Sequence, residues 1–142
     1  MKYTGSGTSY IIRLERGEEM ISTLSDFLAT EGGARSAIFQ GIGALERVKI
    51  GYYDLAKKEY YFRKEQGVFE VASMQGNVSV VDGKPFIHAH AVLSRCDESC
   101  ACIGAHIKEA YVAVTLEVFL TMLEREIGRV HDDVTGLKLL DL

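Results

Sequence analysis

Residues 83–93 run Gly83-Lys-Pro-Phe-Ile-His-Ala-His-Ala-Val-Leu93. Side chains on an extended strand point alternately to its two faces. One face of this stretch is therefore wholly apolar and consists of Ile87, Ala89, Ala91 and Leu93. The other face carries Phe86, His88, His90 and Val92. The alternation predicts a strand with one buried side, and it points His88 and His90 in the same direction.

Three of the four histidines fall within this strand and the next segment, because Gly104-Ala-His106 follows shortly after it. Two imidazoles side by side can share one metal ion, and a third from a neighbouring backbone segment, after a turn of small residues, would complete a three-histidine site. Such a site leaves at least one coordination position open. The spacing alone leaves a second interpretation open, in which these are ordinary surface or hydrogen-bonded core histidines.

The totals describe one soluble domain spanning residues 1–142, with 47% apolar and 25% charged residues. No apolar run is long enough to span a bilayer, and the first residues lack the hydrophobic stretch of a signal peptide. We therefore expect a cytoplasmic protein. The net charge of −4 argues against broad, charge-driven binding of nucleic acids, which requires a basic surface.

Three cysteines, Cys96, Cys100 and Cys102, lie between the histidine segments. An odd number of cysteines in a cytoplasmic chain makes a disulfide framework a poor explanation. The spacing also differs from that of a zinc ribbon, which needs a second pair. The favoured interpretation is a loop or turn of small residues, with a soft-metal site as the alternative.

One amphipathic helix is predicted at about residues 18–31, after a strand over Thr8–Glu15. Its apolar residues recur at helical spacing and are Met20, Ile21, Leu24, Phe27 and Leu28. Glu18 and Glu19 would lie in its first turn, where acidic residues suit the helix dipole. Gly32-Gly33 would end it.

The remaining chain is predicted to form strands and turns. Gly41 and Gly43 indicate a bend, a bulge or a close backbone approach, Gly76-Asn77 a hairpin or bend, and Asp82-Gly83 a tight turn. A short polar helix or turn is expected over residues 121–129. The predicted strands are Ser36–Leu45, Arg47–Tyr53, Glu59–Arg63, Val68–Val80, Ala110–Leu120 and residues 134–140. One face of the strand Ala110–Leu120 should carry Val112, Val114, Leu116 and Val118. The sum is an α+β domain with a mostly antiparallel sheet.

Four segments in this order resemble the plant-and-prokaryote-conserved (PPC) domain family, whose members often carry a DNA-binding label. They are Gly41-Ile-Gly-Ala-Leu45 leading to Gly51-Tyr-Tyr-Asp54, Phe69–Asn77, Asp82–His90, and Gly104-Ala-His106 followed by Thr115-Leu-Glu-Val118. Arg13–Glu19 matches as well. The resemblance covers nearly the whole chain.

The resemblance implies a curved, mostly antiparallel sheet with one main helix, assembled as a homotrimer. It also implies a metal, zinc before other divalent ions, held by histidines matching His88, His90 and His106. One departure concerns Ala105, where bacterial members usually carry a second glycine. A methyl group is tolerated there if the backbone avoids left-handed conformations.

Three functions follow as hypotheses. The first is a metal-binding oligomeric domain with a regulatory or assembly role. The second is a small metal-dependent hydrolase or lyase in which Glu70 or Glu117, both within predicted strands, acts as general base; a salt bridge or subunit contact is the simpler role for either glutamate. The third is DNA binding, which the charge disfavours. The AT-hook of plant relatives is absent, and the cluster Lys57, Lys58, Arg63 and Lys64 is typical of a solvated hairpin.

A cupin is the alternative fold, because cupins also place two histidines at alternate positions of a strand. The cupin motif requires a glutamate a few residues later and a further histidine. Here the first acidic residues after His90 are Asp97 and Glu98, which lie too far along the chain. The later glycine-rich element also lacks the cupin proline.

Overall fold

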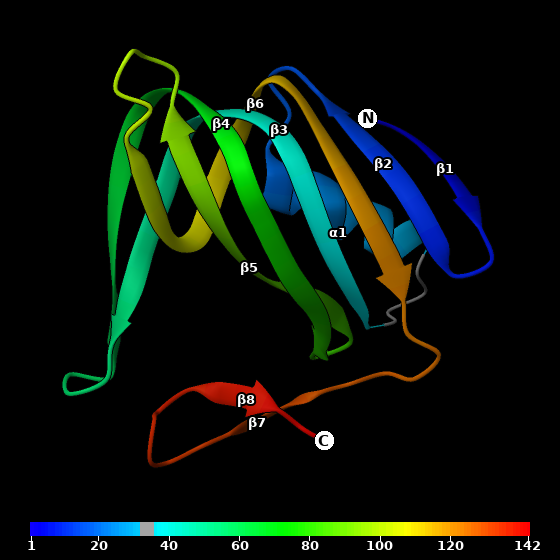
Figure 1. The fold of residues 1–142 in the computed structure, drawn as a ribbon. Coiled ribbons are helices and arrows are strands. Elements are labelled where there is room, and N and C mark those ends of the chain that lie inside the picture. The colour runs from blue at the N-terminus through cyan, green and yellow to red at the C-terminus, as the bar shows by residue number, and fades with distance from the viewer. Residues whose placement is uncertain (32–35) are drawn as a thin grey trace.

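The computed structural model describes residues 1–31 and 36–142. Within these ranges the chain forms one helix, α1 (Met20–Glu31), and eight strands (Figure 1). The strands are β1 (Lys2–Ser6), β2 (Ser9–Glu15), β3 (Ala37–Asp54), β4 (Glu59–Val81), β5 (Lys84–Arg95), β6 (Cys102–Met122), β7 (Arg129–His131) and β8 (Lys138–Leu140). The predicted helix end at Gly32-Gly33 lies outside the described residues.

Six of these strands form one antiparallel sheet in the order β1-β2-β6-β3-β4-β5. The long strand β6 has two partners along the same edge, since its second half pairs with β2 and residues 102–106 pair with β5. This double use of β6 makes the sheet curl strongly, as Figure 1 shows. The predicted curved antiparallel sheet with one helix is confirmed.

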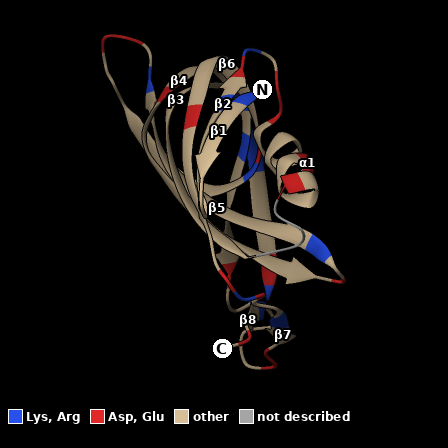
Figure 2. Ribbon diagram, turned by 90° about the vertical axis from the view of Figure 1, so that its right-hand side faces the viewer, with Lys and Arg blue, Asp and Glu red and all other residues tan. Residues whose placement is uncertain are grey.

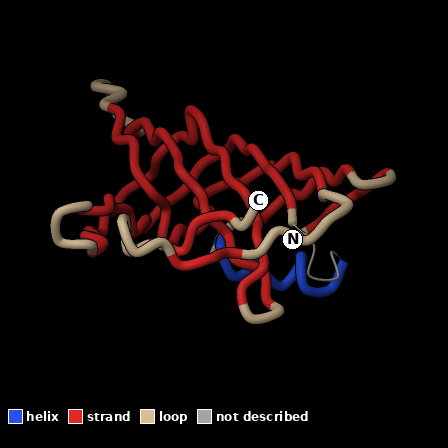
Figure 3. The backbone as a smooth tube through the Cα atoms, turned by 90° about the horizontal axis from the view of Figure 1, so that it is seen from below, coloured by secondary structure: helices blue, strands red, loops and turns tan. Residues whose placement is uncertain are grey.

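The core lies between the sheet and α1, which covers one face of the sheet (Figure 3). Met20, Leu24, Phe27 and Leu28 of the predicted apolar stripe are all buried. From β5, the same core receives Ala89, Ala91 and Leu93. The predicted apolar face of the histidine strand therefore packs inward, and its histidines lie on the opposite face.

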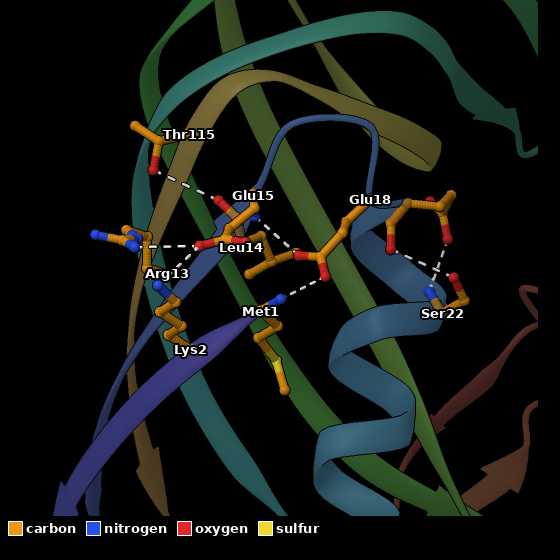
Figure 4. Close-up of polar contacts among 9 residues, drawn as sticks. Met1, Lys2, Arg13, Leu14, Glu15, Glu18, Ser22 and Thr115 are labelled. Atoms are coloured by element: carbon orange, nitrogen blue, oxygen red, sulfur yellow. Dashed lines mark hydrogen bonds and ion pairs between the residues drawn. The ribbon is translucent and has the colours of Figure 1, made fainter.

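The entry to α1 differs slightly from the prediction, because the helix begins at Met20 and no acidic residue lies in its first turn. Glu19 instead precedes the helix, and its carboxylate accepts hydrogen bonds from the backbone N–H groups of Ile21 and Ser22. Glu18 accepts hydrogen bonds from the Met1 ammonium group and the Glu15 backbone (Figure 4). Glu18 thus connects the segment before the helix to Met1 and β2, and Glu19 connects the helix start to β6 by accepting from the backbone N–H of Ala110.

Gly43 lies at an irregularity in the pairing of β3 with β6, in agreement with the predicted bulge or close approach. Its φ is +145°, and an added Cβ would overlap the carbonyl oxygen of Thr115. Between Gly43 and Leu45 the pairing advances from Leu116 to Val112, so β6 carries extra residues there. This shift reverses the alternation locally. Val114, predicted on the apolar face with Val112, is consequently exposed.

Gly76-Asn77 does not form the predicted hairpin or bend, because the strand β4 continues unbroken from Glu59 to Val81. An added Cβ at Gly76 would collide with the ring of Phe39. The glycine therefore marks a close side-chain approach within a strand. The predicted turn at Asp82-Gly83 is confirmed, since both residues have positive φ, as the tight turn of a hairpin requires.

The C-terminal segment contains no helix between Thr121 and Arg129, so that alternative was wrong. β6 continues to Met122, and an irregular connection leads to β7. The predicted terminal strand is shorter than expected, and its last residues form β8. β7 and β8 pair only with each other, in a small sheet at one end of the main sheet (Figures 1 and 2). In the described part of the chain, the single helix is too short to cross a bilayer.

Candidate metal centre

His88, His90 and His106 meet on the face of the sheet opposite α1. His90 and His106 are direct cross-strand partners on β5 and β6. His88 lies two residues before His90 on the same face of β5. The pairing of the two strands therefore brings together the three histidines that the sequence singled out. The fourth, His131, is exposed, and its Nε2 lies 3.3 Å from Oδ1 of Asp133.

The three imidazoles are close enough to share one ion. One nitrogen from each lies within 4.8 Å of the other two. The Nε2 atoms of His88 and His90 are 3.1 Å apart. Three nitrogen ligands around tetrahedral zinc, each about 2.1 Å from the metal, would lie about 3.4 Å from one another. The cluster is thus close to the required geometry.

An unpartnered atom also fits a metal centre. Nδ1 of His106 is buried and has no hydrogen-bond partner among residues 1–31 and 36–142. A buried polar atom without a partner costs free energy, and metal-bound histidines normally pair their second ring nitrogen as well. The His106 ring is otherwise enclosed by Tyr60 and Phe62, whose ring centroids lie 5.2 and 6.0 Å from it.

The environment keeps two of the rings neutral. Burial lowers the pKa of His106 to about 4, and the neighbouring histidines and Lys108 add to this effect. The pKa of His88 is lowered as well, by burial first and then by His90 and Arg129. Neutral imidazole is the form that binds metals, so the site is competent for binding at neutral pH.

The strand leading into His106 accepts Ala105 without strain. Ala105 pairs with Ala91 of β5, and its φ is not positive. Gly104 has room for a side chain as well, since an added Cβ would make only ordinary van der Waals contacts, the nearest at 3.7 Å to Val92. The methyl group at position 105 is therefore compatible with this backbone.

A groove of about 970 Å³ lies beside the histidines on the same face of the sheet. His88 and His90 form one side of it, together with Gln75 and Asn77 of β4. The lining also includes apolar side chains from three further strands, among them Ile11, Ile38 and Phe119. A small molecule in this groove would contact the exposed edges of two candidate ligands.

The other predicted site residues lie elsewhere. Glu117 borders a separate, smaller groove with Arg13 and Glu15. The carboxylate of Glu70 lies 3.8 Å from the Cys96 sulfur. Neither glutamate belongs to the histidine cluster, nor does it line the larger groove among the described residues. Cys96, Cys100 and Cys102 are exposed free thiols around the turn that joins β5 to β6.

Two residues beside the site were absent from the sequence predictions. Tyr60 of β4 lies against His106. Arg129 of β7 bonds to Asn77, the cross-strand partner of His88. The pattern of strand Glu59–Arg63 could have placed Tyr60 on a defined face. Nothing in the local sequence around Arg129 indicates that a separate hairpin returns to the histidine strand.

Comparisons with known proteins agree with this architecture. The model of the Plants and Prokaryotes Conserved (PCC) domain family matches residues 1–124. A PPC protein from Pyrococcus horikoshii is 36% identical, with a TM-score of 0.86 over 99% of this chain and 95% of that one. A comparison with curated proteins finds no match.

Two further solved structures are similar over nearly their full lengths. A metal-containing protein from Archaeoglobus fulgidus is 33% identical, with a TM-score of 0.85 over 100% of both chains. A protein from Ralstonia eutropha named a "putative DNA-binding protein" is 27% identical, with a TM-score of 0.89 over 99% of this chain and 96% of that one. With the family model covering most of its length, the chain belongs to the Plants and Prokaryotes Conserved domain family.

Proposed function

We propose that this chain is an oligomeric metal-binding protein with a regulatory or assembly role, in which His88, His90 and His106 hold one zinc ion. The observation that carries the proposal is the convergence of three imidazole nitrogens within 4.8 Å, one histidine of the three having a buried, unpartnered ring nitrogen. An all-nitrogen set of three ligands suits zinc, and other divalent transition metals are the alternatives. The metal-containing relative supports this assignment.

We further propose that the chain assembles as a homotrimer. The support is the exposed apolar surface beside the histidines, where Ile11, Ile38 and Phe119 are each about half exposed. Contiguous apolar surface of this kind is typical of subunit interfaces. The metal would then lie close to the contact between copies and could fix its geometry.

DNA binding is the function suggested by the names of two similar proteins, and the charge of this chain disfavours it. The net charge is −4, and Lys and Arg lie interspersed with Asp and Glu over the fold (Figure 2). Binding through phosphate contacts needs a continuous basic surface. We expect any affinity for DNA to be weak and to vanish at moderate salt concentration.

The groove beside His88 and His90 favours a second candidate, a small metal-dependent hydrolase or lyase. Zinc held by three histidines supplies Lewis-acid chemistry and lowers the pKa of a water molecule in its open position. Glu70 and Glu117 remain the bases proposed from sequence, although neither lines this groove. An enzyme would therefore need a movement or a second copy to bring a carboxylate to the site.

The first test is the metal content of the purified, untagged protein, measured by elemental analysis. We expect about one zinc per chain, and loss of most of it in His88→Ala and His90→Ala, because two remaining ligands bind zinc weakly. His131→Ala is the matched control, since this exposed histidine lies outside the cluster. Unchanged zinc content in both cluster variants would refute the site.

A further inference from the structure

Arg129 extends from the C-terminal hairpin back onto the histidine face of the main sheet. Its Nε donates to Ser79 Oγ at 2.7 Å and its Nη2 to Asn77 Oδ1 at 3.1 Å. The guanidinium also stacks over Phe86, with 4.7 Å between its Cζ and the ring centroid. Ser79 and Asn77 are the cross-strand partners of Phe86 and His88. The cation is therefore held one strand away from His88.

The charge of this guanidinium is not neutralised by an acidic side chain. Its third hydrogen bond, from Nη1 at 2.8 Å, goes to the backbone carbonyl of Lys138. All three acceptors are thus neutral, and no carboxylate pairs with Arg129 among the described residues. Burial also lowers its pKa, which indicates a partly desolvated cation. Such a cation gains from an anionic partner.

The guanidinium still has capacity for such a partner. It has five N–H donors, of which three are used, so each terminal nitrogen keeps one. Oxyanions such as carboxylate and phosphate are the groups that arginine recognises best, through paired hydrogen bonds.

The surroundings place this capacity next to the candidate metal centre. Arg129 is one of the charges that lower the pKa of His88, and the Tyr60 hydroxyl group influences the pKa of Arg129 in turn. Tyr60 also packs against His106. Arg129, Tyr60 and the three histidines therefore surround one region of the sheet face. Asn77, which accepts from the guanidinium, lies opposite His88 on the adjacent strand, and adjacent strands are about 4.8 Å apart. A molecule of a few atoms could therefore span from the guanidinium to the His88 imidazole.

We propose that Arg129 is the anchor of a binding site for a small oxyanion, a carboxylate or phosphate compound whose other end reaches the three histidines. The neutral side chains of Asn77 and Ser79 orient the Arg129 guanidinium, and the Phe86 ring packs against its plane. The metal end of this site rests on the function proposed above. The anion end does not, because Arg129 is held by Asn77, Ser79 and Lys138 and by none of the histidines.

The test is an NMR titration of the metal-free and zinc-loaded protein with inorganic phosphate and with acetate, following the Nε–H resonance of Arg129. We expect this resonance to shift with both probes in both forms. Arg129→Gln should weaken binding roughly tenfold or more, because it removes the only charge of the anchor. Arg129→Lys should retain part of the affinity, since it keeps the charge and loses the fork.

The matched control is Arg125→Gln, which removes the same charge from an exposed position in the same segment. Arg125→Gln should bind both anions as the wild type does. The hairpin should stay docked in the Arg129 variants, because Tyr53 donates to Thr135 and Lys58 to Asp133 independently of Arg129. Unchanged resonances for residues 130–140 would verify this.

The two proposals fail in different ways. Equal anion affinity in wild type and Arg129→Gln, or no shift of the Arg129 resonance with either probe, would overturn the anion site. If the wild type binds no zinc but Arg129→Gln still weakens phosphate binding, the metal centre is refuted and the anion site stands. Arg129→Gln should leave the zinc content per chain unchanged, because Arg129 is not a ligand.

Discussion

The His106 side chain is both packed against aromatic rings and left with a buried polar atom that lacks a hydrogen bond within the described ranges. Its ring lies against two aromatic side chains, and one of its nitrogens is buried without a hydrogen bond to any residue that the structure describes. Its proton affinity is consequently low, with a pKa of about 4. A metal ion would bind the neutral form of the imidazole and would give a ring nitrogen a partner.

This low pKa predicts that the metal-free protein becomes less stable in mild acid. The ordinary histidine value is 6.5, so between pH 6.5 and about 4 the unfolded chain binds a proton at His106 that the folded chain does not. The stabilisation is complete above pH 6.5 and is lost as the pH falls toward 4. His88 acts in the same direction.

The measurement is the free energy of unfolding from urea titrations at several pH values between 4 and 7.5, without metal. We expect His106→Gln to flatten the loss of stability toward acid relative to wild type. His131→Gln, which changes an exposed histidine, should keep the wild-type slope. An identical slope in wild type and His106→Gln would show that the ring is not desolvated in solution.

The residue pattern predicted part of the site, and the reason is local geometry. Alternation along one strand fixes that His88 and His90 share a face, whatever the fold around them. The pairing of His90 with His106 depends on the register between β5 and β6, which spacing alone does not fix. The spacing therefore only suggested His106 as the third ligand, and the family resemblance implied it as well. Arg129 reaches the site through long-range packing, which no short sequence pattern encodes.

At the scale of the elements, the sequence correctly predicted a special backbone site at Gly43 but wrongly predicted a hairpin or bend at Gly76. Gly43 and Gly76 both occur where another part of the chain comes close, Thr115 in one case and Phe39 in the other. A single sequence cannot distinguish a glycine that permits a turn from one that makes room inside a strand. The strand β4 was therefore divided in the prediction although it is continuous.

Gly43→Ala should be strongly destabilising. The position has a φ of +145°, and a methyl group would overlap the Thr115 carbonyl of the paired strand. We expect a loss of about 2–4 kcal/mol in the free energy of unfolding, from strain and from separation of β3 and β6. Thermal and urea unfolding would measure it.

Gly104→Ala provides the matched comparison, because Gly104 lies in a strand, has no positive φ, and would place an added Cβ only in ordinary van der Waals contact with Val92 and Ala91. This variant should change the free energy of unfolding by less than about 1 kcal/mol. Equal effects at the two glycines would argue against the close approach of the β3 and β6 backbones at Gly43. The comparison also tests the backbone that leads into His106 without altering the histidine.

At the scale of the whole molecule, the sheet has two unlike faces. One packs on α1 and forms the core, and the other carries the histidines, the groove and a set of exposed apolar side chains. Ile11 is the cross-strand partner of Phe119, and Ile38 lies nearby on β3. A fold that buries one face of a sheet with a single helix leaves the other face available to a second copy.

The proposed trimer makes this face the site of contact, and Ile38→Glu should therefore dissociate it. The side chain is 55% exposed in the single chain, and burying a carboxylate among apolar neighbours in an interface is costly. Light scattering coupled to size-exclusion chromatography should give the mass of three chains for wild type and a smaller mass for Ile38→Glu. Val134→Glu, at a position 80% exposed and outside the groove, should leave the mass unchanged.

A wild-type protein that elutes as a single chain would refute the trimer, and an Ile38→Glu variant that keeps the wild-type mass would place the contact on another surface. Because His88 and His90 border the same groove, loss of zinc on dissociation would further show that assembly and metal binding share this face.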